Sequence, residues 1–196
     1  MRGARLGFLL VFAFPVLCLG AETVTVRIET EMGEIDVEVD VARAPVTGAN
    51  FLRYVDAGRY DDGRFHRTVR LDNQPGKTVL IEVVQAGVSP AHAEKDFAPI
   101  PLERTSATRL VHKDGAVSMA RDGPDTATSD FFICIGDQPE LDAGGRRNSD
   151  GQGFAAFGRV VTGMDVVRTI QAAPVRAATQ NLAPPIGILT SRVLER

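Results

Sequence analysis

The clearest pattern in the chain is a strict alternation of apolar and polar residues that begins at Thr23. A second alternating run follows a short polar segment, 31–34, which contains Gly33. The apolar positions of the two runs are Val24, Val26 and Ile28, then Ile35, Val37 and Val39. Because side chains alternate between the faces of a strand, two such runs across a glycine-containing turn predict an antiparallel hairpin with one apolar face.

The segment after this hairpin changes to helical spacing. Pro45 suits the first turn of a helix, and Gly58 suits its end. Between them the apolar residues recur three positions apart, at Ala49, Leu52 and Val55, and Phe51 widens the stripe. The pattern predicts a helix that packs one face on the core.

A second candidate helix begins near Gly163 and ends before Pro174. Its apolar residues share one face: Met164, Val167 and Ile170. The last stretch, Ile186–Leu194, is strand-like again. Many short strands and two separated helices favour a closed antiparallel barrel with helices over its ends, although the pattern alone leaves an open α+β sheet as an alternative.

The first residues have the features of a secretory signal peptide. Arg2 and Arg5 precede an apolar run, Leu6–Leu19, and the small residues Gly20 and Ala21 follow it. The run is shorter than the ~20 residues of a membrane span. We therefore expect residues 1–21 to be a signal peptide and residues 22–196 to form one domain; an uncleaved anchor and a lipoprotein modified at Cys18 are the alternatives.

Composition and charge exclude several classes of function. The formal net charge is −3, and no basic stripe suggests nucleic-acid binding. The three histidines, His66, His92 and His112, lack the spacing of metal ligands, and no glycine-rich phosphate loop is present. We predict no metal and no cofactor. Once Cys18 leaves with the signal peptide, Cys134 is alone in an apolar run, so it cannot form an internal disulfide and is expected to be buried and inert.

Four segments, in this order, resemble the cyclophilins, a family of peptidyl-prolyl cis/trans isomerases. They are Phe65–Arg67, Ser118–Arg121, Phe131–Ile133 and Phe154–Val160. The resemblance extends from about Val24 to the C-terminus and is to the bacterial exported type. It implies a mainly β fold, a closed eight-stranded antiparallel barrel capped by two helices.

By this resemblance Arg67 is the catalytic residue. The planar prolyl amide resists rotation with a barrier of ~18–20 kcal/mol. When the amide twists, the lone pair localises on nitrogen, which becomes a better hydrogen-bond acceptor. A fixed cationic donor aimed at that nitrogen therefore binds the twisted form better than the planar forms. Arginine suits this role because it is always charged and presents a rigid set of donors.

The resemblance also assigns the residues that bind substrate. Phe132 forms the floor of an apolar proline pocket, Gln85 hydrogen-bonds the substrate backbone, and Phe154 stands where the family has a rim histidine. Val83 and Leu141 complete the pocket, and the backbone of Ala120 and Arg121 lies along the peptide. Phe131, on the opposite face of its strand, is expected in the core, and His66 is expected to be structural.

The chain departs from the family at several positions around this pocket. Glu140 replaces a tryptophan, Glu82 replaces an aromatic residue, and Arg121 replaces an asparagine. Two polar, glycine-containing loops, Arg70–Lys77 and Ala143–Gly153, are longer than in familiar members, and they either shape specificity or are solvated decoration.

The predicted function is isomerisation of Xaa-Pro bonds in exported proteins, which accelerates a slow folding step. The alternative is a module of the same fold that binds proline-containing segments without turnover. The expected partners are proline-containing polypeptides, with no nucleic acid and no stable membrane association after cleavage. We expect a monomer in the periplasm.

Overall fold

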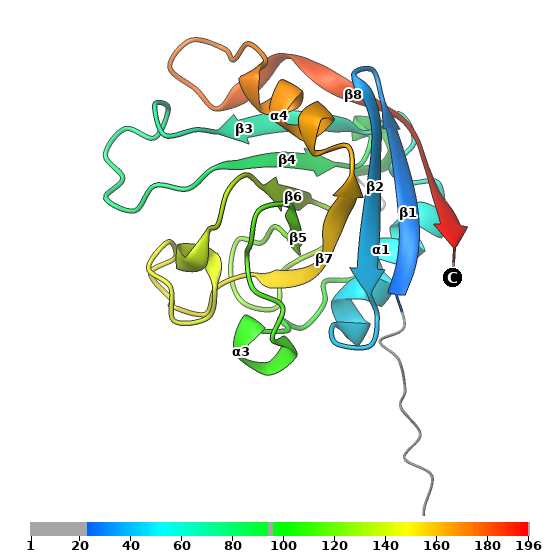
Figure 1. The fold of residues 1–196 in the computed structure, drawn as a ribbon, viewed down its shortest axis with the longest axis horizontal. Helices are drawn as coiled ribbons and strands as arrows, with labels where there is room; N and C mark the ends of the chain where they lie inside the picture. The colour runs from blue at the N-terminus through cyan, green and yellow to red at the C-terminus, as the bar shows by residue number, and fades with distance from the viewer. Residues whose placement is uncertain (1–22, 94–95, 196) are drawn as a thin grey trace, which may run out of the picture.

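The computed structural model describes residues 23–93 and 96–195, so the expected signal peptide lies outside the described residues. Eight antiparallel strands close into a barrel in the order β1-β2-β7-β5-β6-β4-β3-β8, which confirms the predicted architecture (Figure 1). The strands are β1 (Thr23–Thr30), β2 (Gly33–Asp40), β3 (Arg64–Val69), β4 (Val83–Gly87), β5 (Ala116–Met119), β6 (Phe131–Cys134), β7 (Ala155–Thr162) and β8 (Asn181–Glu195).

The N-terminal hairpin forms as the alternation predicts. Val26 pairs with Val37, and Ile28 pairs with Ile35, and these side chains are buried inside the barrel. The opposite face is less open than the pattern suggested, because Asp36 is only 8% exposed. The guanidinium of Arg27 covers it with two hydrogen bonds, from Nε to Oδ1 at 2.8 Å and from Nη2 to Oδ2 at 2.9 Å.

Helix α1 (Pro45–Asp56) covers one end of the barrel, where it contacts β2, β7 and β8. Phe51, Leu52 and Val55 are buried as predicted. The placement of Ala49 on the buried face was wrong, since it is exposed. Asn50 takes a position toward the barrel instead, and its Nδ2 donates to the carbonyl of Thr128 at 2.7 Å.

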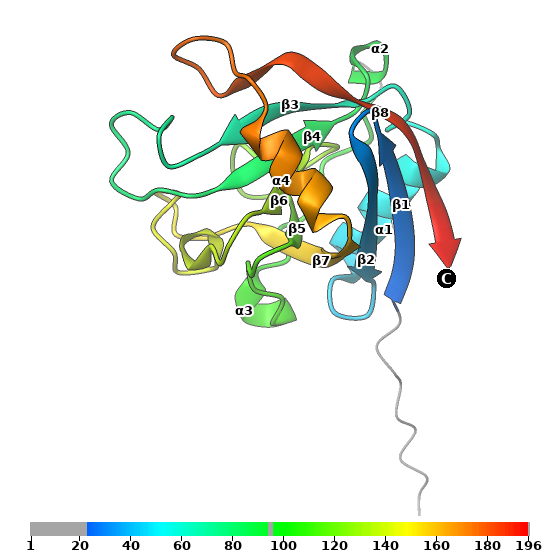
Figure 2. The ribbon, with the colours of Figure 1, turned by 45° about the horizontal axis from the view of Figure 1, so that its top comes forward.

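Helix α4 (Met164–Ala172) covers the opposite end and contacts β2, β3 and β4. Figures 1 and 2 show α4 in front of the barrel and α1 behind it. Val167 and Ile170 are fully buried and Met164 is partly buried, so the predicted face is confirmed. Three short elements were not predicted: α2 (Pro90–Ala93), α3 (Thr105–Thr108) and the 3-10 helix η1 (Pro139–Leu141).

The strands separate two apolar clusters. The larger fills the barrel and contains Phe131, which makes an edge-on contact with Phe51 at a centroid distance of 5.4 Å. The smaller lies on the other face of β4 and β6 and contains Phe132 and Cys134. The alternation that assigned Phe131 to the core and Phe132 to the other side is therefore confirmed. Burial raises the pKa of the Cys134 thiol, as expected for an inert cysteine.

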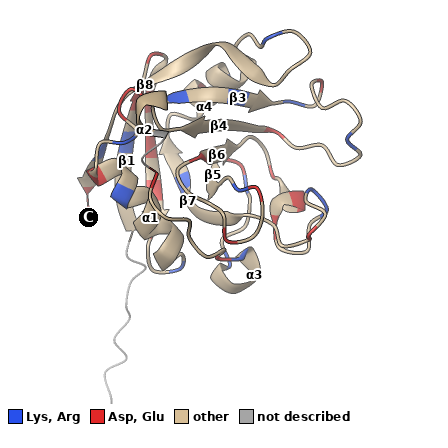
Figure 3. Ribbon diagram, turned by 180° about the vertical axis from the view of Figure 1, so that it is seen from behind, with Lys and Arg blue, Asp and Glu red and all other residues tan. Residues whose placement is uncertain are grey.

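Charged residues of both signs are interspersed along the ribbon (Figure 3). Within residues 23–93 and 96–195, His, Cys, Asp and Glu form no cluster of three that would suit a metal ion. None of the helices in this part of the chain combines the length and hydrophobicity needed to cross a membrane.

Candidate functional site

A pocket of about 490 Å³ lies over the smaller apolar cluster. Its lining includes Lys77 from the loop between β3 and β4 and Arg147 from the loop between β6 and β7. These two loops project on the same side of the barrel (Figure 1). All eight residues that the sequence assigned to catalysis or substrate binding line the pocket: Arg67, Val83, Gln85, Ala120, Arg121, Phe132, Leu141 and Phe154. The structure thus brings together residues from β3, β4 and β6 and from two connecting segments, one between β5 and β6 and one between β6 and β7.

Arg67 is held by two neutral amides. Its Nη1 donates to Oε1 of Gln85 at 2.9 Å, and its Nε and Nη2 donate to Oε1 of Gln180 at 3.0 and 2.6 Å. Burial lowers the pKa of Arg67, but an arginine in a protein remains protonated. Among the described residues, the oxygens that hold the guanidinium are therefore neutral, so they fix it in place without pairing its charge.

Gln85 is oriented in turn by Asp130. Its Nε2 donates to Oδ2 of Asp130 at 2.9 Å, which directs the amide oxygen toward Arg67. Nε2 of His66 lies 3.4 Å from the same carboxylate oxygen. This places His66 beside the network that supports Arg67.

The apolar part of the pocket is built around Phe132, which is 4% exposed. Phe154 meets its ring edge-on at a centroid distance of 5.3 Å. Val83, Leu141 and also Ile81, which the sequence analysis did not assign, line the same surface. The result is an apolar recess next to a fixed cation, with the size and chemistry to hold a proline ring.

A buried hydrogen-bonded chain lies behind this recess. The ring of His112 stacks on Phe132 with centroids 5.9 Å apart and planes 14° apart. Its Nδ1 is 2.7 Å from Oδ1 of Asp142, and its Nε2 is 3.0 Å from the hydroxyl of Ser118. The three residue types match a hydrolase triad, but Ser118 is fully buried and cannot reach a substrate. This hydrogen-bonded series of Asp142, His112 and Ser118 therefore positions Phe132.

Arg121 holds the loop between β6 and β7. Its Nε donates to the carbonyl of Gly153 at 2.9 Å, and its Nη1 pairs with Asp150 at 2.8 Å. The guanidinium lies 5.1 Å from the ring centroid of Phe154. Only 1% of the side chain is exposed, so it supports the pocket wall and is not free to bind a peptide.

The two glutamates that depart from the family pattern do not line the pocket. Oε1 of Glu82 accepts a hydrogen bond from Nε2 of Gln171, in α4, at 2.9 Å. Glu140 pairs with Arg146 at 2.6 Å, and this contact lowers the pKa of Glu140. Neither carboxylate therefore projects into the proline recess.

Sequence reasoning missed Gln180 and the cations Lys77 and Arg147. Lys77 and Arg147 line the pocket from the two long loops, which therefore form part of the site. The length and polarity of these loops indicated that they could shape the site. They did not show which of their side chains would line the pocket. Gln180 precedes β8 in a segment without any periodic pattern.

Comparisons with known proteins show the family of the chain. A sequence model of the family described as cyclophilin type peptidyl-prolyl cis-trans isomerase/CLD matches residues 25–193. The peptidyl-prolyl cis-trans isomerase A of Dickeya dadantii is 31% identical over 192 residues, which cover 94% of this chain and 92% of that protein. A peptidyl-prolyl cis-trans isomerase of Acinetobacter baylyi is 32% identical over 150 residues, 76% of this chain and 72% of that one.

Among solved structures, a cyclophilin type peptidyl-prolyl cis-trans isomerase of Cryptosporidium parvum shares the fold, with a TM-score of 0.70 at 22% identity. The match covers 89% of this chain and 99% of that one. A second structure of the Cryptosporidium protein, solved in the presence of the dipeptide Ala-Pro, has a TM-score of 0.69. The chain thus belongs to the family of cyclophilin-type peptidyl-prolyl cis-trans isomerases.

Proposed function

We propose that the chain isomerises Xaa-Pro bonds in exported proteins and that Arg67 is its catalytic residue. The observation that carries the proposal is the placement of Arg67. Its guanidinium is fixed by Gln85 and Gln180 at the edge of the recess over Phe132. No nucleophile or acid/base pair is required, because the reaction only rotates an amide bond.

The geometry favours the twisted amide. With the proline ring over Phe132, the imide nitrogen would lie on the side of Arg67. Both amides that hold Arg67 are neutral, so they fix its direction without cancelling its charge. A preorganised donor of this kind stabilises the electron pair that localises on nitrogen in the twisted state, and it costs little reorganisation.

The substrates proposed are proline-containing polypeptides. The Cryptosporidium structure in the presence of Ala-Pro supports this class, because that protein has the same fold. We further propose that the protein acts as a monomer in the periplasm, without nucleic acid, metal or cofactor and without stable membrane association after its signal peptide is removed. The apolar run Leu6–Leu19 after two arginines supports the export.

The test replaces Arg67 with alanine and measures kcat/KM on a short proline peptide by NMR exchange or a protease-coupled assay. Loss of one transition-state donor should lower kcat/KM by about tenfold to a thousandfold. Arg64→Ala is the matched control, because Arg64 is exposed on the same strand and does not line the pocket.

Three results would contradict the proposal in different ways. A folded R67A protein as active as the parent would refute the role of Arg67. If R64A lost as much kcat/KM as R67A, the positive charge of β3 would matter and the position of Arg67 would not. A parent protein that binds the peptide but never accelerates exchange would favour the alternative, a binding module without turnover.

A further inference from the structure

The pocket contains more positive charge than the isomerisation of a neutral amide requires. Besides Arg67 and Arg121, the second of which is paired with Asp150, the pocket is lined by Arg147 and by Lys77 from the neighbouring loop. Arg147 belongs to the loop between β6 and β7, and its Nη1 donates to the carbonyl of Val79, in the loop between β3 and β4, at 2.7 Å. One side chain therefore joins the loop between β6 and β7 to the loop between β3 and β4, and it presents its charge to the pocket.

In the part of the chain that the structure describes, Arg147 differs from its neighbours because no carboxylate pairs with its side chain. Arg146 pairs with Glu140 and Arg121 pairs with Asp150. Within residues 23–93 and 96–195, the hydrogen-bond acceptors of the Arg67 and Arg147 side chains are all neutral amide or carbonyl oxygens. A guanidinium has five donors, so most donors of Arg147 are left for another group.

The two guanidiniums also act on each other. The pKa of Arg147 is lowered first by its burial and then by the positive charge of Arg67. Like charges held together in a partly buried site repel, and an anion placed near both of them would relieve that repulsion.

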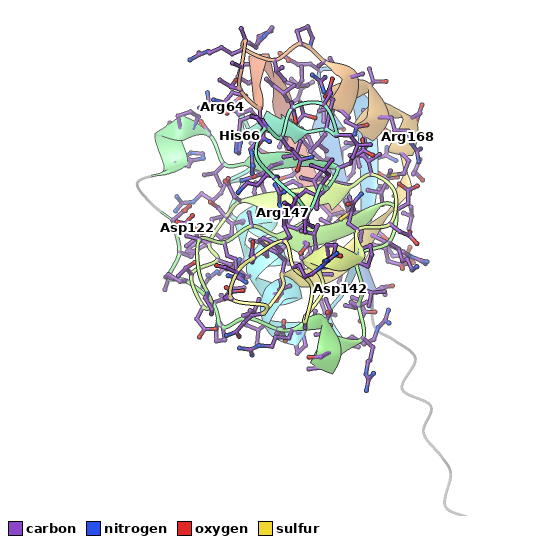
Figure 4. The ribbon with its side chains drawn as sticks, turned by 90° about the vertical axis from the view of Figure 1, so that its left-hand side faces the viewer. Arg64, His66, Asp122, Asp142, Arg147 and Arg168 are labelled. Atoms are coloured by element: carbon purple, nitrogen blue, oxygen red, sulfur yellow. The ribbon has the colours of Figure 1, made fainter. Side chains whose placement is uncertain are left out.

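The acidic residues of the pocket come from a different wall. Asp122 and Asp130 lie in the segment between β5 and β6, and Asp130 is already engaged by Gln85. Figure 4 shows Arg147 near the middle of the face where the two long loops meet, with Asp122 apart from it on its own loop. The basic wall formed by Lys77 and Arg147 is therefore open to an anion from outside the protein.

We infer that this site prefers proline segments that carry a carboxylate side chain on a residue next to the proline, and that Arg147 is the residue that determines this specificity. The inference rests on the proposed isomerase function. Arginine suits a carboxylate because its planar donors can bind both oxygens at once. The preference comes from binding the acidic residue, whereas Arg67 acts on the imide nitrogen.

The test compares peptides that differ only next to the proline, with Glu, Gln or Lys at the following position and, in a second set, at the preceding position. NMR exchange gives kcat/KM for each. In at least one set the Glu peptide should exceed the Gln peptide by about three- to tenfold, as expected for one partly solvated charge-assisted contact. The Lys peptide should be slowest, and about 0.5 M salt should reduce the ratio.

Variants then assign the preference to one residue. Arg147→Gln should bring the Glu/Gln ratio close to one, and Arg147→Lys should keep part of it, because the charge remains while the planar donors are lost. Arg146→Gln is the matched control: it removes the same charge from the adjacent position of the same loop, but Arg146 is turned toward Glu140. It should leave the ratio unchanged.

Failure of this inference is distinguishable from failure of the proposed function. If the parent isomerises Glu and Gln peptides equally well in both sets, or if R147Q retains the ratio, Arg147 sets no acidic preference while the isomerase function stands. If R146Q lowers the ratio as much as R147Q, only the general charge of the loop matters and the inference is wrong. If no peptide in either set is isomerised, the proposed function itself fails.

Discussion

Asp142 shows how a single residue can support the pocket without touching the substrate. Its Oδ1 accepts a hydrogen bond from Nδ1 of the His112 ring. The backbone N–H of His112 also donates to Oδ1, at 3.1 Å. Since His112 is fully buried against Phe132, loss of the carboxylate would leave polar groups unsatisfied directly behind the pocket floor.

Asp142→Ala should therefore lower the free energy of unfolding by about 1–3 kcal/mol, the cost of leaving a buried polar group unpaired. It should also lower kcat/KM several-fold, because Phe132 loses its fixed support. Urea unfolding followed by circular dichroism gives the first quantity, and peptide exchange gives the second. Asp137→Ala is the control, because Asp137 makes an exposed ion pair with Lys113, the residue that follows His112. Equal losses in both variants would refute the role of Asp142.

At the scale of single residues, the sequence predicted the site residues that its resemblance to the cyclophilins could identify. Arg67 and Phe132 lie in the segments that carry the resemblance, Gln85 was assigned by the resemblance outside them, and all three line the pocket. Gln180 and Arg147 could not be found in this way, because each acquires its position from tertiary contacts with distant residues. A lone polar residue in a loop carries no local signal of such contacts.

At the scale of elements, the first hairpin combines a predictable pattern with an unpredicted ion pair. Alternation correctly gave the buried residues of β1 and β2. It could not show that Arg27 would lie over Asp36 from the paired strand, because that contact depends on the register in which Arg27 is opposite Asp36. The error over Ala49 in α1 has the same origin, since a polar residue with a partner can displace an apolar one from a buried face.

The Arg27–Asp36 pair should make the stability of the hairpin depend on pH. The hydrogen bonds from Arg27 lower the pKa of Asp36 in the folded protein. The unfolded chain therefore takes up a proton at higher pH than the folded protein. The stabilisation is complete above the unfolded pKa of about 4 and is lost as the pH falls through the lower folded pKa.

Asp36→Asn should accordingly be less stable than the parent at pH 7, and the difference should shrink as the pH approaches 3. Thermal unfolding of both proteins across this range measures the difference. Glu34→Gln is the control, because Glu34 contacts the same arginine but is 53% exposed and should contribute less. A difference between parent and D36N that stays constant from pH 7 to about 3 would contradict the assignment.

At the scale of the whole molecule, closure of the barrel joins the two ends of the described chain. β1 pairs with β8, with Val26 opposite Val193, so the first and last strands lie side by side (Figure 1). Local alternation could not choose between an open sheet and this barrel, because closure depends on a pairing between the most distant strands. The number of short strands favoured the barrel, and the resemblance to the cyclophilins decided between the two.

The position of β1 also bears on export, which stays a prediction. β1 begins at Thr23, which pairs with Asp40. Cleavage after Gly20 or Ala21 would therefore remove the apolar run Leu6–Leu19 and leave every strand of the barrel complete. A secretory signal has to precede the folded domain in the sequence, and residues 1–21 all precede β1.

We expect the exported protein, produced in a secreting bacterial host, to begin at Ala21 or Glu22, as measured by N-terminal sequencing or intact mass. Leu10→Arg should block processing, because a charge in the apolar run opposes its insertion into the membrane. Leu194→Arg is the control: it adds the same charge at an exposed position of β8 and should leave processing unchanged. An exported protein that begins at Met1 would indicate an uncleaved anchor, and one that begins at Cys18 would indicate a lipoprotein; either result would overturn the prediction that residues 1–21 are a cleaved signal peptide.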